Sequence, residues 1–292
     1  MASLLLLKQR IKAAQNVSKT TRAMQMVAAS KMKKAQEATL ATRPYVEKLT
    51  QINQNLLDKI ENKASHPYIA EKALTGKSLI IVLSPDKGLC GGLITNLLRE
   101  FLRNQKTDVN AEYIVVGKKA VAKVAHFTNE IIASFDFGTT TPMFDMVHPL
   151  TKLIDEHYLG GSVDNVKLLY TNFNSIFTQT PRITTILPLT TSTDEDEEKM
   201  PKETPESEYL FEPPIEEILP ELLKHYLEMS LFQYILESFV SEQGARMISM
   251  QNATNNANDI ISDLQLEYNK TRQSKITSDI LDLNSGGMSN AE

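Results

Sequence analysis

This sequence of 292 residues contains a single cysteine, Cys90, and few of the residues that form turns. One thiol excludes an intrachain disulfide and any zinc site built from several cysteines, and it is compatible with a reducing compartment. Eleven glycines and 12 prolines are few for this length, which disfavours an all-β fold. The 41% of hydrophobic and 23% of charged residues indicate a folded protein rather than a disordered one.

Long hydrophobic runs are also missing. No stretch approaches the roughly 18 apolar residues that a membrane-spanning helix needs. The apolar run Leu4–Leu7 is followed at once by Lys8, Arg10 and Lys12, whereas a signal peptide has its charges first and a longer apolar core after them. We therefore expect a protein that is neither exported nor integral to a membrane.

The net charge of −5 excludes a nucleic-acid binder that is basic over its whole surface. The charge is unevenly distributed, because residues 1–60 carry eleven lysines and arginines against three acids. A basic helix in an acidic protein indicates an anionic partner, either nucleic acid or an acidic protein surface. Small residues such as Ala28 and Ala35 favour close protein contact, and no aromatic residues interleave there to stack on bases.

Residues 1–60 predict one long helix that lies along another helix. They contain no glycine and a single proline, Pro44, which should bend the helix rather than end it. At about 1.5 Å per residue the helix would be on the order of 85 Å long, so it cannot cover its own apolar stripe. The stripe recurs in steps of three and four, as in a helix–helix seam, at Leu7, Ile11, Ala14, Val17, Thr21, Met24, Ala28, Met32, Ala35, Val46, Leu49, Ile52, Leu56 and Ile60.

A second helix of this kind is predicted at the other end of the chain. No proline follows Pro220, only Gly244 interrupts a helical pattern that reaches Leu283, and Gly286–Gly287 is the expected stop. The two stripes are best buried against each other, and an antiparallel pair is favoured because a compact middle domain sends both helices out from one side. The second stripe comprises Leu222, Tyr226, Ile235, Phe239, Met247, Met250, Ala257, Ile261, Leu264 and Tyr268.

The middle of the chain alternates between strand and helix patterns, which predicts a small α/β layer with parallel crossovers. The predicted strands are residues 78–83, 113–116, 131–135, 166–170 and 183–187, and the predicted helices are residues 93–102, 118–125 and 143–157. Between this layer and the last helix, residues 188–217 contain eleven acids and two lysines, which is typical of a solvated acidic loop. We therefore expect a mixed α+β and α/β fold with four parts: a helix over 1–60, a Rossmann-like α/β domain over 76–190, an acidic linker over 191–214 and a helix over 215–285.

A Rossmann-like layer invites a search for nucleotide binding, and the glycine patterns match poorly. Asp86–Gly92 follows the first predicted strand and precedes a helix, but it is not G-x-G-x-x-G. Gly76-Lys77-Ser78 resembles the end of a P-loop, yet residue 71 is Glu and the segment precedes a strand instead of following one. The favoured interpretation is that these glycines allow tight turns and close helix packing.

Other chemistry is equally absent from the sequence. The five histidines show no metal-binding spacing, and no G-x-S-x-G elbow occurs. Cys90, among glycines and without a histidine near it in sequence, is expected to be a small packing residue rather than a nucleophile. The acids at 194–198 lie in a predicted loop, a poor place to hold catalytic geometry. We predict no catalytic residue, no metal site and no cofactor.

Several motifs resemble the gamma subunit of F-type ATP synthases, in the same order and over nearly the whole chain. Thr21–Met32 is similar to that family's N-terminal signature, and Asp86–Gly92 to the strand-to-helix turn of its middle domain. Tyr209–Pro213 is similar to the entry to its last helix. The C-terminal resemblance lies in Ser241–Met247, Asn252–Thr254, Tyr268–Gln273 and Ile276-Thr277.

The resemblance implies that the terminal helices form an antiparallel coiled coil, the central shaft inside a ring of three alpha and three beta subunits. The α/β domain would be a foot on the membrane rotor ring of c subunits and would also hold epsilon. Rotation of the shaft would force the catalytic beta subunits through their conformations and couple proton flow to ATP synthesis or hydrolysis. The subunit itself would have no active site and no nucleic-acid partner.

The same resemblance assigns contact residues one by one. Arg272, Gln273, Thr277 and Arg246 match positions on the last helix that engage beta-subunit loops, although without the resemblance Arg246 is better interpreted as a solvent-facing charge. Met24, with Arg22 beside it, matches a position that faces an acidic beta-subunit loop, although without the resemblance Met24 is better interpreted as a seam residue. In the foot, positions near the c-ring and epsilon are matched by Tyr209 and Glu212.

Some features depart from the family. The opening Leu4–Leu7 is more apolar than the family's mixed-charge start, Gly244 stands where a larger residue is usual, and the paired regulatory cysteines of chloroplast members are absent. With no transit peptide, we expect a bacterial protein, peripheral on the cytoplasmic face of the cell membrane. Two alternatives stay open from the residues alone: a coiled-coil nucleic-acid-binding protein and a nucleotide-dependent α/β protein.

Overall fold

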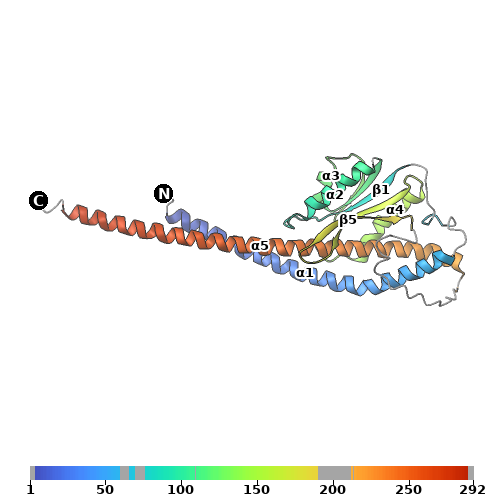
Figure 1. Ribbon diagram of the computed structural model, residues 1–292, viewed down its shortest axis with the longest axis horizontal. Coiled ribbons are helices and arrows are strands. Elements are labelled where there is room, and N and C mark those ends of the chain that lie inside the picture. Colours follow the sequence, from blue (N-terminus) through green and yellow to red (C-terminus); the bar gives the residue numbers. More distant parts are fainter. Residues whose placement is uncertain are drawn as a thin grey trace. The chain divides into compact units, whose positions relative to one another are not determined.

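The computed structural model describes residues 4–59, 66–69, 76–108, 110–189, 212 and 214–288. In chain order, a small α/β domain stands between two long helices, and all of these elements are drawn in Figure 1. The elements are α1 (Leu4–Lys59), β1 (Ser78–Leu83), α2 (Leu93–Thr107), β2 (Ala111–Val116), α3 (Lys118–Val124), β3 (Ile131–Phe135), the 3-10 turn η2 (Phe144–Met146), α4 (Val147–Leu159), β4 (Asn165–Phe173), β5 (Gln179–Leu187) and α5 (Ile215–Met288).

Both long helices run through residues that usually interrupt helices. α1 continues through Pro44, and α5 continues through Pro220. The expectation that Gly286–Gly287 stops the last helix is wrong, because α5 extends to Met288. A glycine lowers helix stability by about 1 kcal/mol relative to alanine, which is a cost that a long helix can absorb.

The chain forms two compact units, and both contain a piece of each long helix. Unit 1 consists of Met1–Ala29 and Arg246–Glu292, and unit 2 of Ser30–Ala245. In unit 1 the Thr21 hydroxyl lies 2.7 Å from the Thr254 hydroxyl, and Ser18 Oγ donates to Asn258 Oδ1 at 2.8 Å. Moving along α1 from Ser18 to Thr21, the partner on α5 moves back from Asn258 to Thr254, so the two helices are antiparallel.

The seam of unit 1 differs from the predicted stripe at two positions of α1, and on α5 it adds Thr254 and Thr271. Val17 and Met24 are 52% and 41% exposed, whereas Ser18 and Gln25 are half-buried in their place. A strict alternation of four and three steps keeps the seam in phase, and the apolar side chains one position earlier fall outside it. The observed seam contains Leu7, Ile11, Ala14, Ser18, Thr21, Gln25 and Ala28 on α1, against Met250, Thr254, Ala257, Ile261, Leu264, Tyr268 and Thr271 on α5.

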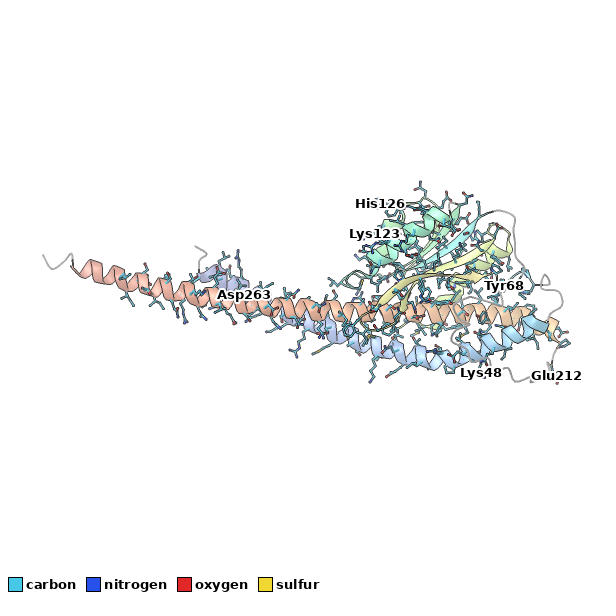
Figure 2. All side chains as sticks on the ribbon, viewed as in Figure 1. Lys48, Tyr68, Lys123, His126, Glu212 and Asp263 are labelled. Carbon is cyan, nitrogen blue, oxygen red and sulfur yellow. The ribbon has the colours of Figure 1, made fainter. Side chains whose placement is uncertain are left out.

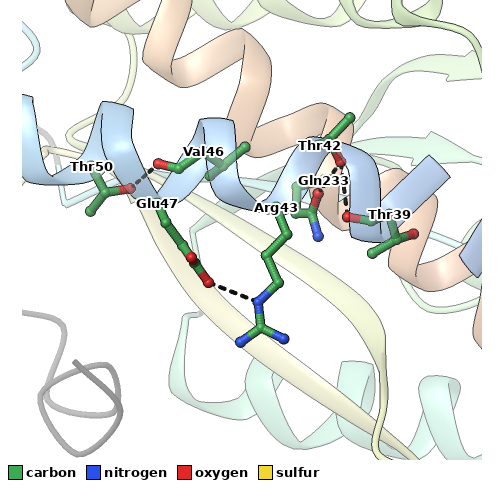
Figure 3. A network of polar contacts seen from close by, with 7 residues as sticks. All are labelled: Thr39, Thr42, Arg43, Val46, Glu47, Thr50 and Gln233. Atoms are coloured by element: carbon green, nitrogen blue, oxygen red, sulfur yellow. Dashed lines mark hydrogen bonds and ion pairs between the residues drawn. The ribbon is translucent and has the colours of Figure 1, made fainter. Parts of the chain in front are cut away.

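Unit 2 repeats the antiparallel pairing and adds the α/β domain. Thr42 Oγ1 donates to Gln233 Oε1 at 2.8 Å (Figure 3), and the Tyr45 hydroxyl lies 2.7 Å from His225 Nε2. The five-stranded sheet has the order β3-β2-β1-β4-β5. Its first four strands are parallel, as predicted, but β5 is antiparallel to β4. Only residues 174–178 separate these two strands, which allows a hairpin but no crossover.

Helices cover both faces of the sheet. On one face, α2 and α3 bury Leu97, Phe101 and Val124 against a core that includes Ile80 and Val115. On the other face lie α4 and α5 (Figure 1). Tyr234 of α5 packs on Tyr170 of β4 there, with ring centroids 4.7 Å apart. Only this second face of the sheet joins the α/β domain to the long helices of unit 2.

α5 is held to the domain over a stretch in which it is buried on nearly all sides. Ser238 Oγ accepts the backbone N–H of Thr171 at 3.2 Å, and Ser241 Oγ donates to the Thr171 carbonyl at 3.0 Å. The ring of Phe239 stacks on Phe137, with centroids 6.2 Å apart. A serine pair that uses both polar groups of one strand residue, together with an aromatic anchor, fixes the register of α5 on β4.

Candidate functional site: surfaces for partner contact

The predicted contact residues of α1 point away from the helix pair. Arg22 is exposed, and Met24 is 41% exposed, so the interpretation of Met24 as a seam residue is wrong. At about 100° per residue, Arg22 and Met24 lie roughly 80° to either side of a seam that passes between Thr21 and Gln25. They flank the seam on opposite sides and therefore offer two different surfaces.

The predicted contact residues near the end of α5 are all exposed. Thr271 is half-buried, and all side chains over residues 272–281 are exposed. Arg272 lies at the flank of the seam, while Gln273 and Thr277 lie on the face turned away from it. Thr277 Oγ1 donates to the Gln273 carbonyl at 2.9 Å, a bond within the helix that leaves the Gln273 amide facing outward. This segment presents a guanidinium and a carboxamide, which are suited to carboxylate and backbone acceptors.

Arg246 is half-buried, so it is not a fully solvent-facing charge. It belongs to the same stretch of the pair as Met24, because Thr254, which faces Thr21, is eight residues from Arg246. Arg272 lies roughly 40 Å further along α5, at about 1.5 Å per residue. The structure thus divides the predicted contacts of unit 1 into two groups, one around Met24 and Arg246 and one at residues 272–277.

The remaining predicted contacts lie near the start of α5. Glu212 is exposed (Figure 2). Tyr209 lies outside the described residues, as does the acidic stretch 194–198.

The glycine-rich turn after β1 holds a carboxylate where a nucleotide phosphate would need backbone donors. Asp86 Oδ1 accepts the N–H groups of Lys118 at 2.9 Å and Phe137 at 3.1 Å, and Oδ2 accepts that of Gly138 at 2.7 Å. These donors stand at the start of α3 and in the loop after β3, at the carboxyl edge of the parallel strands where α/β folds bind ligands. The chain's own acid uses them, which supports the structural interpretation of the glycines.

The rest of this turn is packed rather than reactive. Cys90 is 2% exposed, as expected for a small packing residue. Gly91 has a φ of +59°, which glycine adopts at little cost, and Gly92 caps α2. Beside the turn, Lys118 Nζ lies 2.9 Å from Asp136, and this hydrogen bond raises the pKa of the lysine. The arrangement locks three loops together and contains no nucleophile–base pair.

Four of the five histidines have structural neighbours. His148 lies 3.6 Å from Glu228, His157 lies 3.3 Å from Glu112, and His225 faces Tyr45. Burial lowers the pKa of His66, whose Nδ1 accepts the backbone N–H of Tyr68. Within the described residues no group of three or more histidine, cysteine or acidic side chains is arranged to hold a metal ion.

The basic surplus of α1 is compensated in part within the chain. Lys31 donates to the carbonyl of Thr139, Lys33 lies 3.9 Å from Glu37, and Arg43 Nε lies 2.8 Å from Glu47 Oε1 (Figure 3). The last two are exposed pairs one turn apart, which contribute little stability. None of the helices in the described part of the chain combines the length and apolar character that crossing a lipid bilayer requires.

Comparison with known proteins gives a consistent result over the whole chain. A family model described as ATP synthase matches residues 3–289. The ATP synthase gamma chain of Dehalococcoides mccartyi strain CBDB1 is 40% identical over 294 residues, which cover 98% of this chain and 98% of that protein. The ATP synthase gamma chain of Psychrobacter cryohalolentis is 35% identical over 292 residues, again with 98% of each chain covered.

Solved structures show the same fold. The rotor of the Euglena gracilis mitochondrial ATP synthase superposes with a TM-score of 0.65 at 19% identity, covering 94% of this chain and 98% of that one. A chain from the central stalk and c-ring of the Tetrahymena thermophila mitochondrial ATP synthase gives 0.59 at 22% identity, covering 80% and 99%. At these identities the likeness establishes the architecture of two long helices and one α/β domain.

Proposed function

This chain belongs to the ATP synthase gamma chain family, and from that premise we propose that it is the central rotor stalk of a bacterial F-type ATP synthase. In this role it couples ion flow through the membrane sector to conformational cycling of the catalytic subunits. The observation that carries the proposal is the antiparallel pair of α1 and α5, which continues in both units and ends in the exposed segment 272–281.

A rotor needs a stiff element that presents different side chains in different directions. Continuous helices supply the stiffness, and the seam leaves Arg22, Met24 and Gln273 facing outward at different angles. A contact made at only some rotor angles changes the relative energies of the surrounding conformations, which is the requirement for transmitting a conformational change. We therefore propose that Arg22, Met24, Arg246, Arg272, Gln273 and Thr277 contact beta subunits.

The proposed partners follow from the same function. The helix pair would lie within a hexamer of alpha and beta subunits, and the α/β domain would stand on the c-ring and hold epsilon, with Tyr209 and Glu212 near that contact. The functional parts are then residues 1–60, 76–190, 191–214 and 215–285. The complex would place this chain at the cytoplasmic face of the bacterial cell membrane, attached only through its partners.

Co-purification distinguishes this function from the two alternatives. The tagged chain is purified from gently detergent-solubilised membranes, and the accompanying proteins are identified by mass spectrometry. A rotor stalk should bring alpha, beta, epsilon and c subunits in constant proportion. Recovery with nucleic acid would favour the DNA- or RNA-binding alternative, and recovery alone with bound nucleotide would favour the nucleotide-dependent one.

The contact residues are tested by separating assembly from activity. In the double variant Arg272→Ala with Gln273→Ala, the subunit should fold and assemble, because both side chains lie outside the seam. ATP synthesis and ATP-driven proton pumping in inverted vesicles should fall. The matched control is Lys106→Ala with Thr107→Ala, which also removes one cation and one exposed polar side chain, at the end of α2. Wild-type rates in the first variant would remove these residues from the mechanism, and loss of assembly would reassign them to structure.

A further inference from the structure

A groove lies between α2 and the C-terminal end of α3, on the face of the sheet that α4 and α5 do not cover. Its volume is about 540 Å³, within the roughly 300–1,000 Å³ that is usual for binding clefts. On α2 it is lined by Thr95, Leu98, Arg99 and Leu102, and on the opposite side by Lys123, His126 and Phe127.

The lining combines an apolar floor with basic edges. Leu98 is 8% exposed and Leu102 packs on the core, while the Phe127 ring is 48% exposed and reaches back to within 6.5 Å of the Phe101 ring centroid. Arg99 stands on one edge. Lys123 and His126 stand on the other, where Figure 2 shows them on the side of the domain away from α5.

The positive charges of the groove have no acidic partner of their own. No acid is among the lining residues, and no ion pair in the described part of the chain engages Arg99 or Lys123. Arg99 Nη1 donates only to the neutral Asn96 Oδ1, at 3.0 Å. Charge complementarity therefore requires an anionic occupant, and the floor requires an occupant that also carries apolar side chains.

Backbone hydrogen bonds fix the turn that carries Phe127. The side-chain amide of Gln105 donates to the Phe127 carbonyl at 2.9 Å, which ties the turn after α3 to α2. The backbone N–H groups of Phe127 and Thr128 both donate to the Val124 carbonyl, so the turn itself is fixed. A groove that exists before binding costs its ligand little ordering.

The spacing of the lining residues indicates the shape of the occupant. On α2, Thr95, Leu98, Arg99 and Leu102 follow the i, i+3, i+4, i+7 pattern of a single helix face. The opposite side is formed by Lys123 in the last turn of α3 and by His126 and Phe127 in the turn that follows α3. A helix face bordered by an exposed aromatic ring makes a groove that receives a helix through its apolar stripe. One aromatic side chain cannot stack successive bases, so the groove does not suit single-stranded nucleic acid.

We propose that this groove binds an acidic amphipathic helix of a partner protein, with aliphatic side chains on Leu98, Leu102 and Phe127 and carboxylates on Arg99 and Lys123. The arginine fork suits bidentate carboxylate binding, and the lysine suits a point contact. The proposal does not depend on the rotor function, because it uses the face of the sheet opposite α5.

The test is photo-crosslinking in the intact complex in native membranes. Phe127 is replaced by p-benzoylphenylalanine, and the crosslinked peptide is sequenced by mass spectrometry. We expect one peptide from another protein, with apolar residues at helical spacing flanked by Asp or Glu. The same probe at Leu159, 46% exposed at the end of α4, should not capture that peptide.

Charge variants decide whether the capture is specific. Arg99→Glu with Lys123→Glu should lower the crosslink yield roughly tenfold, the effect of losing and reversing two partly desolvated ion pairs. The control variant Lys119→Glu reverses one charge on α3 outside the groove. It should change the crosslink yield by no more than about twofold. Unchanged melting of each variant controls for folding. The proposal is overturned by equal yields in all variants, by no crosslink, or by capture of lipid, nucleic acid, a second copy or residues 191–214 of the same chain.

Discussion

Gly244 gives the sharpest prediction about the packing of unit 2, because alanine should be better than the native residue there. It lies inside α5, where a glycine costs about 1 kcal/mol relative to alanine. A Cβ at this position would lie 3.4 Å from Phe173 Cε2, 3.5 Å from Met32 Sδ and 3.9 Å from Gln179 Nε2. These are ordinary van der Waals distances, so one methyl group fits between α1, β4 and β5.

Gly244→Ala should therefore stabilise the chain by about 1 kcal/mol and raise its melting temperature by roughly 2–4 °C. The measurement is thermal and denaturant unfolding of the purified chain followed by far-ultraviolet circular dichroism. Gly244→Leu should reverse the sign, because a larger side chain would have to displace Phe173 or Met32, which costs roughly 1–3 kcal/mol.

Gly117→Ala is the matched glycine control. Gly117 has a φ of +105°, and a Cβ there would lie 1.7 Å from the Ser84 carbonyl oxygen, so the backbone of two loops would have to move. We expect a loss of at least about 2 kcal/mol. A similar loss of stability in Gly244→Ala would contradict the prediction, because it would mean that α1 and β4 leave no room for a methyl group beside α5.

Further outcomes are expected for ligands, redox state and pH. The purified chain should bind neither ATP nor NAD specifically, and calorimetry showing stoichiometric micromolar binding would contradict this. ATPase activity of the complex should ignore dithiothreitol once the other subunits' cysteines are removed, because buried Cys90 has no second cysteine in the chain. Burial, with a smaller effect from nearby carboxylates, raises the pKa of Tyr113 and of Tyr158 to about 12. Below pH 10, the ordinary tyrosine pKa, both phenols are neutral in the folded and in the unfolded chain, so they do not lower the free energy of unfolding. Between about pH 10 and 12 they ionise in the unfolded chain but not in the folded one, so the free energy of unfolding should fall. Urea midpoints at pH 9 and 11 check this, and replacing both tyrosines by phenylalanine should reduce the loss.

The periodicity of the sequence predicts most of the fold because strands and helices here have clear signals. The strand over 78–83 is apolar after its first residue, Ser78, and the strand over 131–135 is bounded by polar residues. Both strands have the predicted limits. The hairpin of β4 and β5 could not be predicted in the same way. Alternating strands and helices suggested a parallel layer, and the direction of β5 depends on the length of one loop.

The seam shows why apolar pattern alone misplaces residues by one position. Val17 and Met24 are more hydrophobic than Ser18 and Gln25, so a count of apolar steps selects them. In the structure Ser18 lies in the seam instead of Val17. A polar side chain can be half-buried there because its hydroxyl donates a hydrogen bond to Asn258 of α5. The apolar stripe placed Met24 in the seam, whereas its side chain is exposed, as a residue that contacts a partner must be.

The residues that hold α5 to the α/β domain could not be predicted, because their contacts join segments that are far apart in the sequence. Ser238 and Ser241 read as polar breaks in a helical stripe, and only the strand beside them shows that both bind Thr171. Asp86 could have been found from its place, an acid directly after a buried strand and before two loops rich in backbone donors. Its three acceptor bonds depend on loops that meet only in the folded sheet.

Rotation of this chain inside its complex is the most direct test of the central claim. The purified complex is immobilised through its beta subunits, and a bead is attached to an engineered cysteine at the exposed position Lys106 of α2, since buried Cys90 should not be labelled. On addition of ATP, the bead should turn in one direction and in steps, and it should stop when ATP is removed. A bead that stays fixed while the same complex hydrolyses ATP at its normal rate would contradict the proposed rotor stalk.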